Sequence, residues 1–178
     1  MRIKTVNFLY LILGLFGFKS LPAAADIFLC APEISGEVTA PRYLDCIDLS
    51  SWQWGAGVAI SRTGLGVDFS TPSLSELTIS KQSDSSSDDL LNYFTTHSVI
   101  PEFKLYVDEC ASCADGDPRV QVTLKDVYIS GVSQSSGGTG LPSEAVSLNY
   151  GSIQWCYRSA GLKQPLECSN DIPVVPRR

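Results

Sequence analysis

Histidine is almost absent from this chain of 178 residues, since His97 is the only one. A Ser-His-Asp or Cys-His catalytic site would have to use this single side chain. His97 follows a predicted helix, where a histidine commonly caps the last carbonyls, and we favour that role over catalysis. We therefore do not expect an enzyme, and we assign no catalytic, cofactor-binding or metal-ligating residue and no cofactor.

Long apolar runs are also scarce. The run over residues 8–18 is eleven residues long, which is too short to span a membrane comfortably. Two basic residues precede it and three alanines, 23–25, follow it, which is the layout of a secretory signal peptide. We expect cleavage between Ala25 and Asp26, so residues 1–25 would be the signal peptide and the mature chain would be periplasmic or extracellular. An uncleaved membrane anchor is the alternative.

Basic residues become scarcer still once that segment is removed. The chain then loses three of its thirteen basic residues and none of its nineteen acidic ones, which leaves a net charge of −9. An acidic surface repels phosphate backbones, and no basic amphipathic stretch favours docking to a membrane surface. We therefore expect neither nucleic acid nor a membrane as a partner of the mature chain.

All six cysteines lie beyond the predicted cleavage point, and an even number in an exported chain indicates disulfides. Cys110 and Cys113 form a CxxC motif that precedes a turn cluster rather than a helix, so a local disulfide is favoured over a redox centre. The other four either pair within the chain or include Cys46 and Cys168 as links between subunits. The disulfide candidates are Cys30, Cys46, Cys110, Cys113, Cys156 and Cys168.

Three stretches alternate apolar and polar residues and then change phase. The changes fall at Ser50-Ser51, Lys125-Asp126 and Gly151-Ser152. Because side chains alternate between the two faces of a strand, a bulge or bend at each point would restore a common apolar face. Long bent strands let two packed sheets form one closed barrel, whereas shorter strands would form an ordinary sandwich. The apolar positions are Ile47, Leu49, Trp52, Trp54, Ala56, Val58 and Ile60; Val120, Val122, Leu124, Val127 and Ile129; and Val146, Leu148, Tyr150, Ile153, Trp155 and Tyr157.

One helix is predicted. Three serines, 85–87, offer an N-cap, two aspartates follow in the first turn, and Leu90, Leu91 and Phe94 form an apolar stripe. The helix should end near His97, before the extended Ile100-Pro101 pair. Shorter strands are expected over residues 26–31, 77–81 and 102–107, and two extended or mobile loops over residues 35–45 and 133–142.

Several of these segments together resemble the Hcp family of hemolysin-coregulated proteins. The similar segments are Asp26-Ile27-Phe28-Leu29, Gly36-Glu37, Trp52-Gln53-Trp54-Gly55, the helix over residues 88–97, Thr123-Leu124-Lys125-Asp126-Val127, and the stretch over residues 141–155. The resemblance covers residues 26–158, which we take as one domain, and leaves residues 159–178 as a C-terminal tail.

This resemblance implies an all-β fold with one helix, namely a closed β-barrel of two packed sheets with a single α-helix and an extended loop. It also implies a structural subunit that forms hexameric rings able to stack into a type VI secretion tube. Pro41, Arg42, Tyr43 and Leu44 would contact the neighbouring ring. The main partner would be the protein itself, with secretion-machine components or lumen cargo as others. A monomeric exported barrel that acts as a binding module or effector is the alternative.

Overall fold

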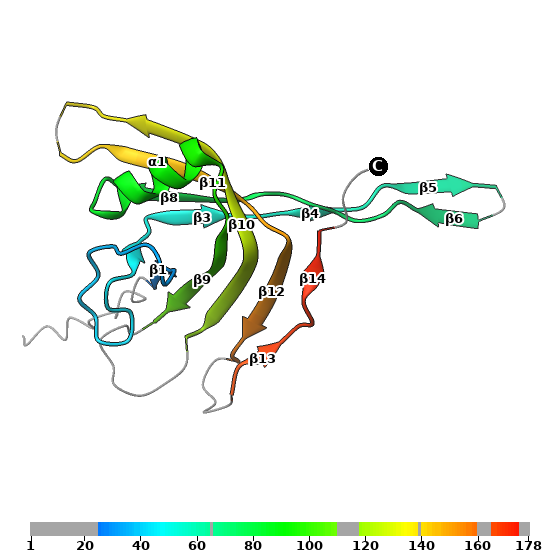
Figure 1. The fold of residues 1–178 in the computed structure, drawn as a ribbon. Coiled ribbons are helices and arrows are strands. Elements are labelled where there is room, and N and C mark those ends of the chain that lie inside the picture. Colours follow the sequence, from blue (N-terminus) through cyan, green and yellow to red (C-terminus); the bar gives the residue numbers. More distant parts are fainter. Residues whose placement is uncertain (1–24, 65, 110–117, 139, 160–164, 175–178) are drawn as a thin grey trace, which may run out of the picture.

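The strands form two packed layers that share one long bent strand (Figure 1). The computed structural model describes residues 25–64, 66–109, 118–138, 140–159 and 165–174. The first layer has the order β2-β1-β9-β10-β12, and the second has the order β10-β11-β8-β3. These strands are β1 (Asp26–Cys30), β2 (Ile47–Asp48), β3 (Ser51–Gln53), β8 (Leu77–Gln82), β9 (Ile100–Asp108), β10 (Val120–Ser135), β11 (Ser143–Asn149) and β12 (Ser152–Tyr157).

A hydrophobic core fills the space between the layers. It combines side chains from both of them, among them Leu29, Leu105 and Ile153 from the first layer and Ile79 and Leu148 from the second. All five are fully buried. For the part of the chain that the structure describes, the prediction of an all-β fold of two packed sheets with one helix is confirmed.

Strand β10 bends where its apolar pattern changes phase. Val122 and Leu124 are buried before the bend and Val127 after it, while Lys125 and Asp126 between them are exposed. Asp126 has a positive φ of 52°, and at this point β10 exchanges its partner β12 for β11. The predicted bend at Lys125-Asp126 is confirmed.

Gly151 packs directly against this bend. A Cβ at Gly151 would lie 3.2 Å from the Cβ of Asp126, so a larger residue would require one of the two chains to move. The N–H of Gly151 donates to the carbonyl of Lys125 over 2.9 Å. The third predicted phase change, at Gly151-Ser152, therefore falls between β11 and β12, which are two strands rather than one.

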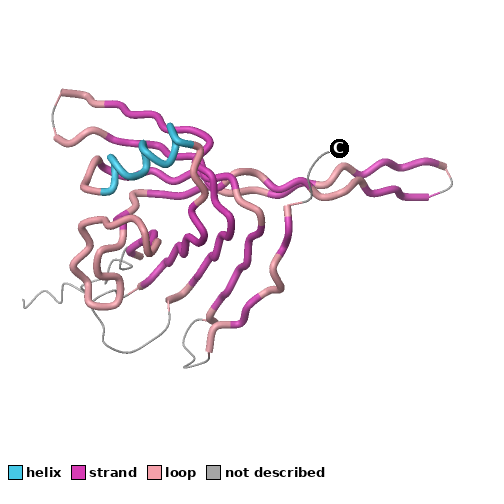
Figure 2. The backbone as a smooth tube through the Cα atoms, in the orientation of Figure 1, coloured by secondary structure: helices cyan, strands magenta, loops and turns pink. Residues whose placement is uncertain are grey.

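The phase change at Ser50-Ser51 occurs as expected, but the long core strand predicted after it does not form. Leu49 is buried and Trp52 packs on the core from β3. Val58 and Ile60, however, are 44% and 55% exposed, so the prediction of one core strand reaching Ile60 is wrong. Residues 55–75 instead leave the body as a two-stranded ribbon, which we call the arm (Figure 2).

Helix α1 (Ser86–Thr96) lies against the β10 side of the second layer and buries Leu90 (Figure 1). Its first N–H groups are capped by Asp84, whose carboxylate accepts from the Ser86 N–H over 2.9 Å, and Ser85 makes no side-chain cap bond. The helix ends at His97, whose φ is 53° and whose backbone N–H donates to the carbonyl of Phe94. The predicted helix is confirmed, although an aspartate caps it and not the serines.

A buried ionic cluster joins α1 to the second layer. Lys81 of β8 is fully buried, and its Nζ lies 2.8 Å from Asp84 and 3.0 Å from Glu144 of β11. Ser83 and Ser87 also donate to Glu144. Burial opposes the charge of Glu144, but the hydrogen bonds from Lys81, Ser83 and Ser87 lower its pKa. Every charge in this cluster has a partner, as a buried ion pair requires.

Strands β10 and β11 pair as a hairpin, and residues 133–135 of the predicted loop over residues 133–142 belong to β10. After β12, two short strands, β13 (Glu167–Cys168) and β14 (Ile172–Pro173), pair with the free side of β12. The predicted signal peptide, apart from Ala25, and the Cys110–Cys113 motif lie outside the described residues.

Candidate assembly interface

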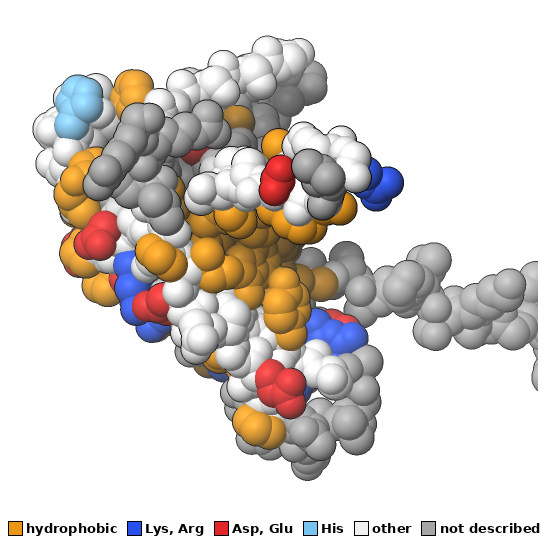
Figure 3. Space-filling model, turned by 90° about the vertical axis from the view of Figure 1, so that its right-hand side faces the viewer, with side chains coloured by type: hydrophobic (Ala, Val, Ile, Leu, Met, Phe, Trp, Pro, Cys, Tyr) orange, Lys and Arg blue, Asp and Glu red, His pale blue; other side chains and the backbone are white. Residues whose placement is uncertain are grey.

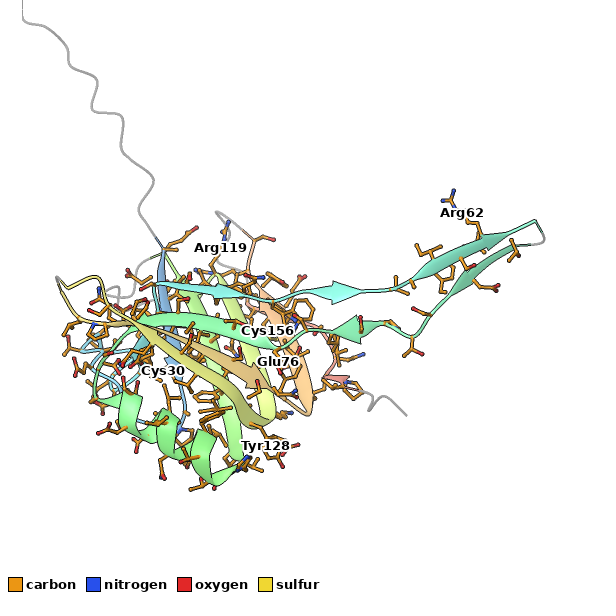
Figure 4. All side chains as sticks on the ribbon, turned by 90° about the horizontal axis from the view of Figure 1, so that it is seen from above. Cys30, Arg62, Glu76, Arg119, Tyr128 and Cys156 are labelled. Atoms are coloured by element: carbon orange, nitrogen blue, oxygen red, sulfur yellow. A yellow bond between two sulfur atoms is a disulfide. The ribbon has the colours of Figure 1, made fainter. Side chains whose placement is uncertain are left out.

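The arm is built from two short strand pairs in series. Strands β4 (Ala56–Gly57) and β7 (Ser73–Leu74) pair near the body, and β5 (Ile60–Thr63) and β6 (Gly66–Phe69) pair further out. Serine hydroxyls add hydrogen bonds between the two sides of the ribbon. At its base the N–H of Gly55 donates to Oγ of Ser75 over 2.8 Å, and between the two strand pairs the N–H of Ala59 donates to Oγ of Ser70 over 2.9 Å. Figure 4 shows Arg62 projecting from the outer part of the arm, far from the sheets.

The outer part of the arm is amphipathic. Ile60 pairs with Phe69 and Arg62 pairs with Val67, so these four side chains lie on one face, whereas Ser61, Thr63, Gly66 and Asp68 lie on the other. Ile60, Val67 and Phe69 are 55%, 51% and 68% exposed. An isolated two-stranded ribbon is marginally stable in water, and exposed apolar patches are typical of surfaces that contact other molecules.

The base of the arm is tied to the body through Tyr150. The phenol oxygen of Tyr150 accepts a hydrogen bond from Nε1 of Trp54 on the outgoing strand, and its O–H donates to the carbonyl of Ser75 on the returning strand over 2.7 Å. Burial raises the pKa of this phenol above its ordinary value. Both strands of the arm are therefore fixed where they leave the body.

An aromatic cluster surrounds this base. Trp155 of β12 lies at its centre, with ring centroids 5.0 Å from Trp54, 5.6 Å from Trp52 and 6.0 Å from Tyr157. Trp155 is buried, the other two tryptophans are half-buried and Tyr157 is exposed. Figure 3 looks toward the arm and shows hydrophobic side chains gathered on the body around and below its base. The three tryptophans, which the sequence pattern placed on a common apolar face, pack together at the core.

The loop predicted to contact a neighbouring ring is folded onto the body instead of extending from it. Tyr43 is only 3% exposed, stacks on Phe28 with centroids 4.5 Å apart, and donates to the Asp108 carboxylate over 2.7 Å. Arg42 forms an ion pair with the same carboxylate at 3.0 Å. Burial and the hydrogen bond to Asp108 raise the pKa of Tyr43.

This packing overturns the prediction that residues 35–45 form an extended or mobile loop. Of the four residues assigned to ring contacts, Pro41 and Leu44 are exposed on this loop, Arg42 is half-buried and Tyr43 belongs to the interior. Their role in contacts between rings stays a prediction. The segment that extends from the molecule is the arm.

Among the described residues, two disulfides hold peripheral segments to the sheet. Cys30 at the end of β1 is bonded to Cys46, which closes the loop that carries Tyr43. Gly36 allows this loop to fold tightly, because a Cβ there would lie 2.4 Å from the carbonyl oxygen of Cys46. Cys156 of β12 is bonded to Cys168 of β13. Cys46 and Cys168 are thus paired within the chain, and the alternative that they link subunits does not hold in this structure.

The described residues contain no group of three or more His, Cys, Asp and Glu side chains able to hold a metal ion. His97 lies at the exposed end of α1. A hollow beside β1 is lined by several acidic side chains, and burial, followed by the charges of Asp26 and Asp84, raises the pKa of Asp48 there. Within the described part of the chain, no helix has the length and hydrophobicity needed to cross a membrane.

The arm is the feature that sequence reasoning missed. Its apolar alternation over Trp54, Ala56, Val58 and Ile60 matches that of a core strand. The available signal was the density of glycine and serine over residues 55–75, together with the return of a matching alternation at Val67 and Phe69. Two short amphipathic segments flanking Gly64 indicate a hairpin.

Comparison with known proteins agrees with this architecture. Residues 28–157 match the family model described as type VI secretion system effector, Hcp. Among solved structures, a type VI secretion system effector from Yersinia pestis superposes with a TM-score of 0.66 at 19% identity, covering 84% of this chain and all of that one. Hcp1 from Salmonella typhimurium gives 0.62 at 23% identity, covering 82% and 92%. Hcp3 from Pseudomonas aeruginosa, a secreted protein, gives 0.55 at 15% identity, covering 82% and 95%.

No curated protein matches the sequence. These three solved structures are too distant in sequence to show more than the fold. The family model, however, spans most of the chain, from the second half of β1 through the end of β12. The chain belongs to the Hcp family of type VI secretion system effectors.

Proposed function

We propose that the protein is a structural subunit that assembles with copies of itself through the arm. Copies form rings, hexameric by the family resemblance, and the rings stack into a tube. The arm of one copy packs its apolar face on the body of the next. Because the arm and its docking surface are different parts of the chain, the contact is heterologous. Such contacts form a closed ring only if the rotation that relates one copy to the next returns to the first copy.

The observation that carries this proposal is the unpartnered apolar face of Ile60, Val67 and Phe69 on a ribbon held away from the core. The ribbon is fixed at its base by the two hydrogen bonds of Tyr150, so it projects in a set direction. A rigidly aimed, amphipathic ribbon costs less conformational entropy on docking than a free loop would.

The disulfides support an assembly that works outside the cytoplasm. The two disulfides of the described residues form and persist in oxidising compartments. We place the mature chain, after cleavage between Ala25 and Asp26, in the periplasm or the extracellular space. Components of a secretion machine, or cargo held in the lumen of a ring, are further partners within this proposal.

Sizing chromatography with light scattering and negative-stain electron microscopy test the proposal on the mature chain under oxidising conditions. We expect ring-sized particles for the wild type and their loss in Phe69→Glu, which places a charge on the apolar face of the arm. Ser61→Glu is the matched control, since it adds the same charge to the opposite face of the same ribbon. Equal assembly by both variants would contradict docking through the apolar face.

A monomeric exported binding module is the second candidate. The observation in its favour is the hollow lined by Asp26, Glu37, Asp48 and Asp84, whose charge suits a cationic ligand. A wild-type protein that stays monomeric at all concentrations would favour this reading over the first.

A further inference from the structure

The C-terminal segment lies alongside β12 as an additional strand (Figure 1). Cys168 and Glu167 pair with Cys156 and Tyr157, and further along Ile172 pairs with Ile153. The segment over residues 165–174 therefore follows β12 along its length on the side opposite β10. It lies beyond residue 157, where the match to the family model ends.

Backbone hydrogen bonds and one covalent bond hold this segment. The N–H of Ser169 donates to the carbonyl of Trp155 over 2.7 Å, and Oγ of Ser169 accepts from the Trp155 N–H over 3.1 Å. At the far end, the N–H of Val174 donates to the carbonyl of Gly151 over 2.9 Å. The disulfide between Cys156 and Cys168 adds the covalent link.

Side-chain burial contributes little to this attachment. Glu167, Cys168 and Ile172 are exposed, and only Val174 packs partly against the core. Lys125 and Asp171 form an ion pair at 2.7 Å, but both side chains are almost half exposed, and such surface pairs stabilise little. The segment is therefore held to β12 as a strand is held in a sheet, and not as part of the hydrophobic core.

A sheet edge without a partner presents unpaired N–H and C=O groups that accept a strand from another chain. We propose that the edge of β12 is a strand-acceptor site, that the chain's own residues 165–174 occupy it as a disulfide-tethered plug, and that the vacated edge takes up the same segment from a second copy of the chain. This surface is separate from the arm and does not depend on assembly through it.

The test uses a mature chain that ends at Ser159, so that Cys156 is left as a free thiol, and a synthetic peptide of residues 165–174. The peptide carries Cys168 as a mixed disulfide with a small thiol. The Cys156 thiolate attacks the sulfur of Cys168, the bond between these two sulfurs forms, and the small thiol leaves with the electron pair. This exchange needs no added oxidant. Intact-mass measurement follows its rate.

A peptide with Ser169→Pro is the matched control, because it lacks the N–H and the hydroxyl that bond Trp155 and retains every other group. If the edge aligns the strand, the native peptide is captured about tenfold faster than the control, since the lost hydrogen bonds belong to the aligned state. Hydrogen exchange at the Trp155 amide should then slow to its rate in the full chain. Equal capture rates, or capture that leaves this amide unprotected, would overturn the proposal.

The full-length Cys168→Ser chain keeps the test valid if the shortened chain does not fold. Its resident tail is still present but no longer tethered, and the activated peptide must displace it to reach Cys156. Faster capture of the native peptide than of the Ser169→Pro peptide supports the acceptor site in this chain as well. No difference between the two peptides would overturn it.

Discussion

Two segments that leave the sheets, a loop and the arm, differ in whether their apolar side chains are packed against the rest of the chain. The loop over residues 31–46 folds back on β1 and β9, and its Tyr43 stacks on Phe28 and bonds Asp108. The arm over residues 55–75 runs outward and leaves Phe69 exposed. The loop packs its aromatic side chain on its own chain, whereas the arm leaves its apolar face uncovered. Under the proposed function, a second copy of the chain covers that face.

Truncation of Tyr43 should produce the largest loss of stability. Tyr43→Ala removes a buried ring from the loop and leaves the Asp108 carboxylate without that hydrogen bond, so the free energy of unfolding should fall by about 3–5 kcal/mol. Urea denaturation followed by tryptophan fluorescence measures the change. Tyr43→Phe, which keeps the ring and removes only the hydroxyl, should lose less than half as much; equal losses would contradict the importance of ring packing.

Removal of the loop disulfide should have the next largest effect. The bridge between Cys30 and Cys46 joins residues 16 apart. Loss of this constraint on the unfolded chain in Cys30→Ser/Cys46→Ser should lower the free energy of unfolding by about 2–4 kcal/mol. Thermal unfolding of the wild type and the variant under oxidising conditions measures this change, and the variant under reducing conditions serves as the comparison. An unchanged midpoint would mean that the aromatic contacts alone hold the loop.

Acid should weaken the body through Glu144. Its pKa in the folded protein lies below its ordinary value of 4.5, so the unfolded state binds a proton more readily than the folded one. The stability that this provides is complete above pH 4.5 and is lost as the pH falls through the lower, folded-state pKa. Urea denaturation at a series of pH values between neutral pH and pH 3 should show that the free energy of unfolding falls less steeply with pH in Glu144→Gln than in the wild type. In Glu102→Gln, which removes a more exposed ion pair with Lys104, the free energy of unfolding should fall with pH as steeply as in the wild type.

The arm should show the smallest effect on stability. Phe69→Ala changes an exposed side chain, so the free energy of unfolding of the monomer should stay within about 0.5 kcal/mol of the wild type. Urea denaturation at a protein concentration below that of assembly measures it. A loss comparable to that of Tyr43→Ala would show that the arm packs on its own body and would remove the contrast between the two segments.

The sequence predicted those features that depend on neighbours along the chain. The change of apolar phase at Lys125-Asp126 marked a real bend, and the stripe of Leu90, Leu91 and Phe94 marked helix α1. These patterns reflect the period of a strand or helix, which a sequence records directly. The resemblance to the Hcp family likewise identified the fold.

The loop and the arm were misassigned because their difference is set by tertiary partners. The residues that hold Tyr43 are Phe28 and Asp108, and Asp108 is distant from it in the chain. The alternation in the arm is the same whether a strand packs on a core or on a second molecule. The pairing of Cys30 with Cys46 and of Cys156 with Cys168 depends on strand neighbours in the same way.

The oligomeric state of the mature chain tests the central claim most directly. Light scattering and electron microscopy of the oxidised protein over a range of concentrations should show ring-sized particles that Phe69→Glu reduces to monomers. A wild-type protein that remains a monomer at every concentration would contradict the account of the arm as an assembly element.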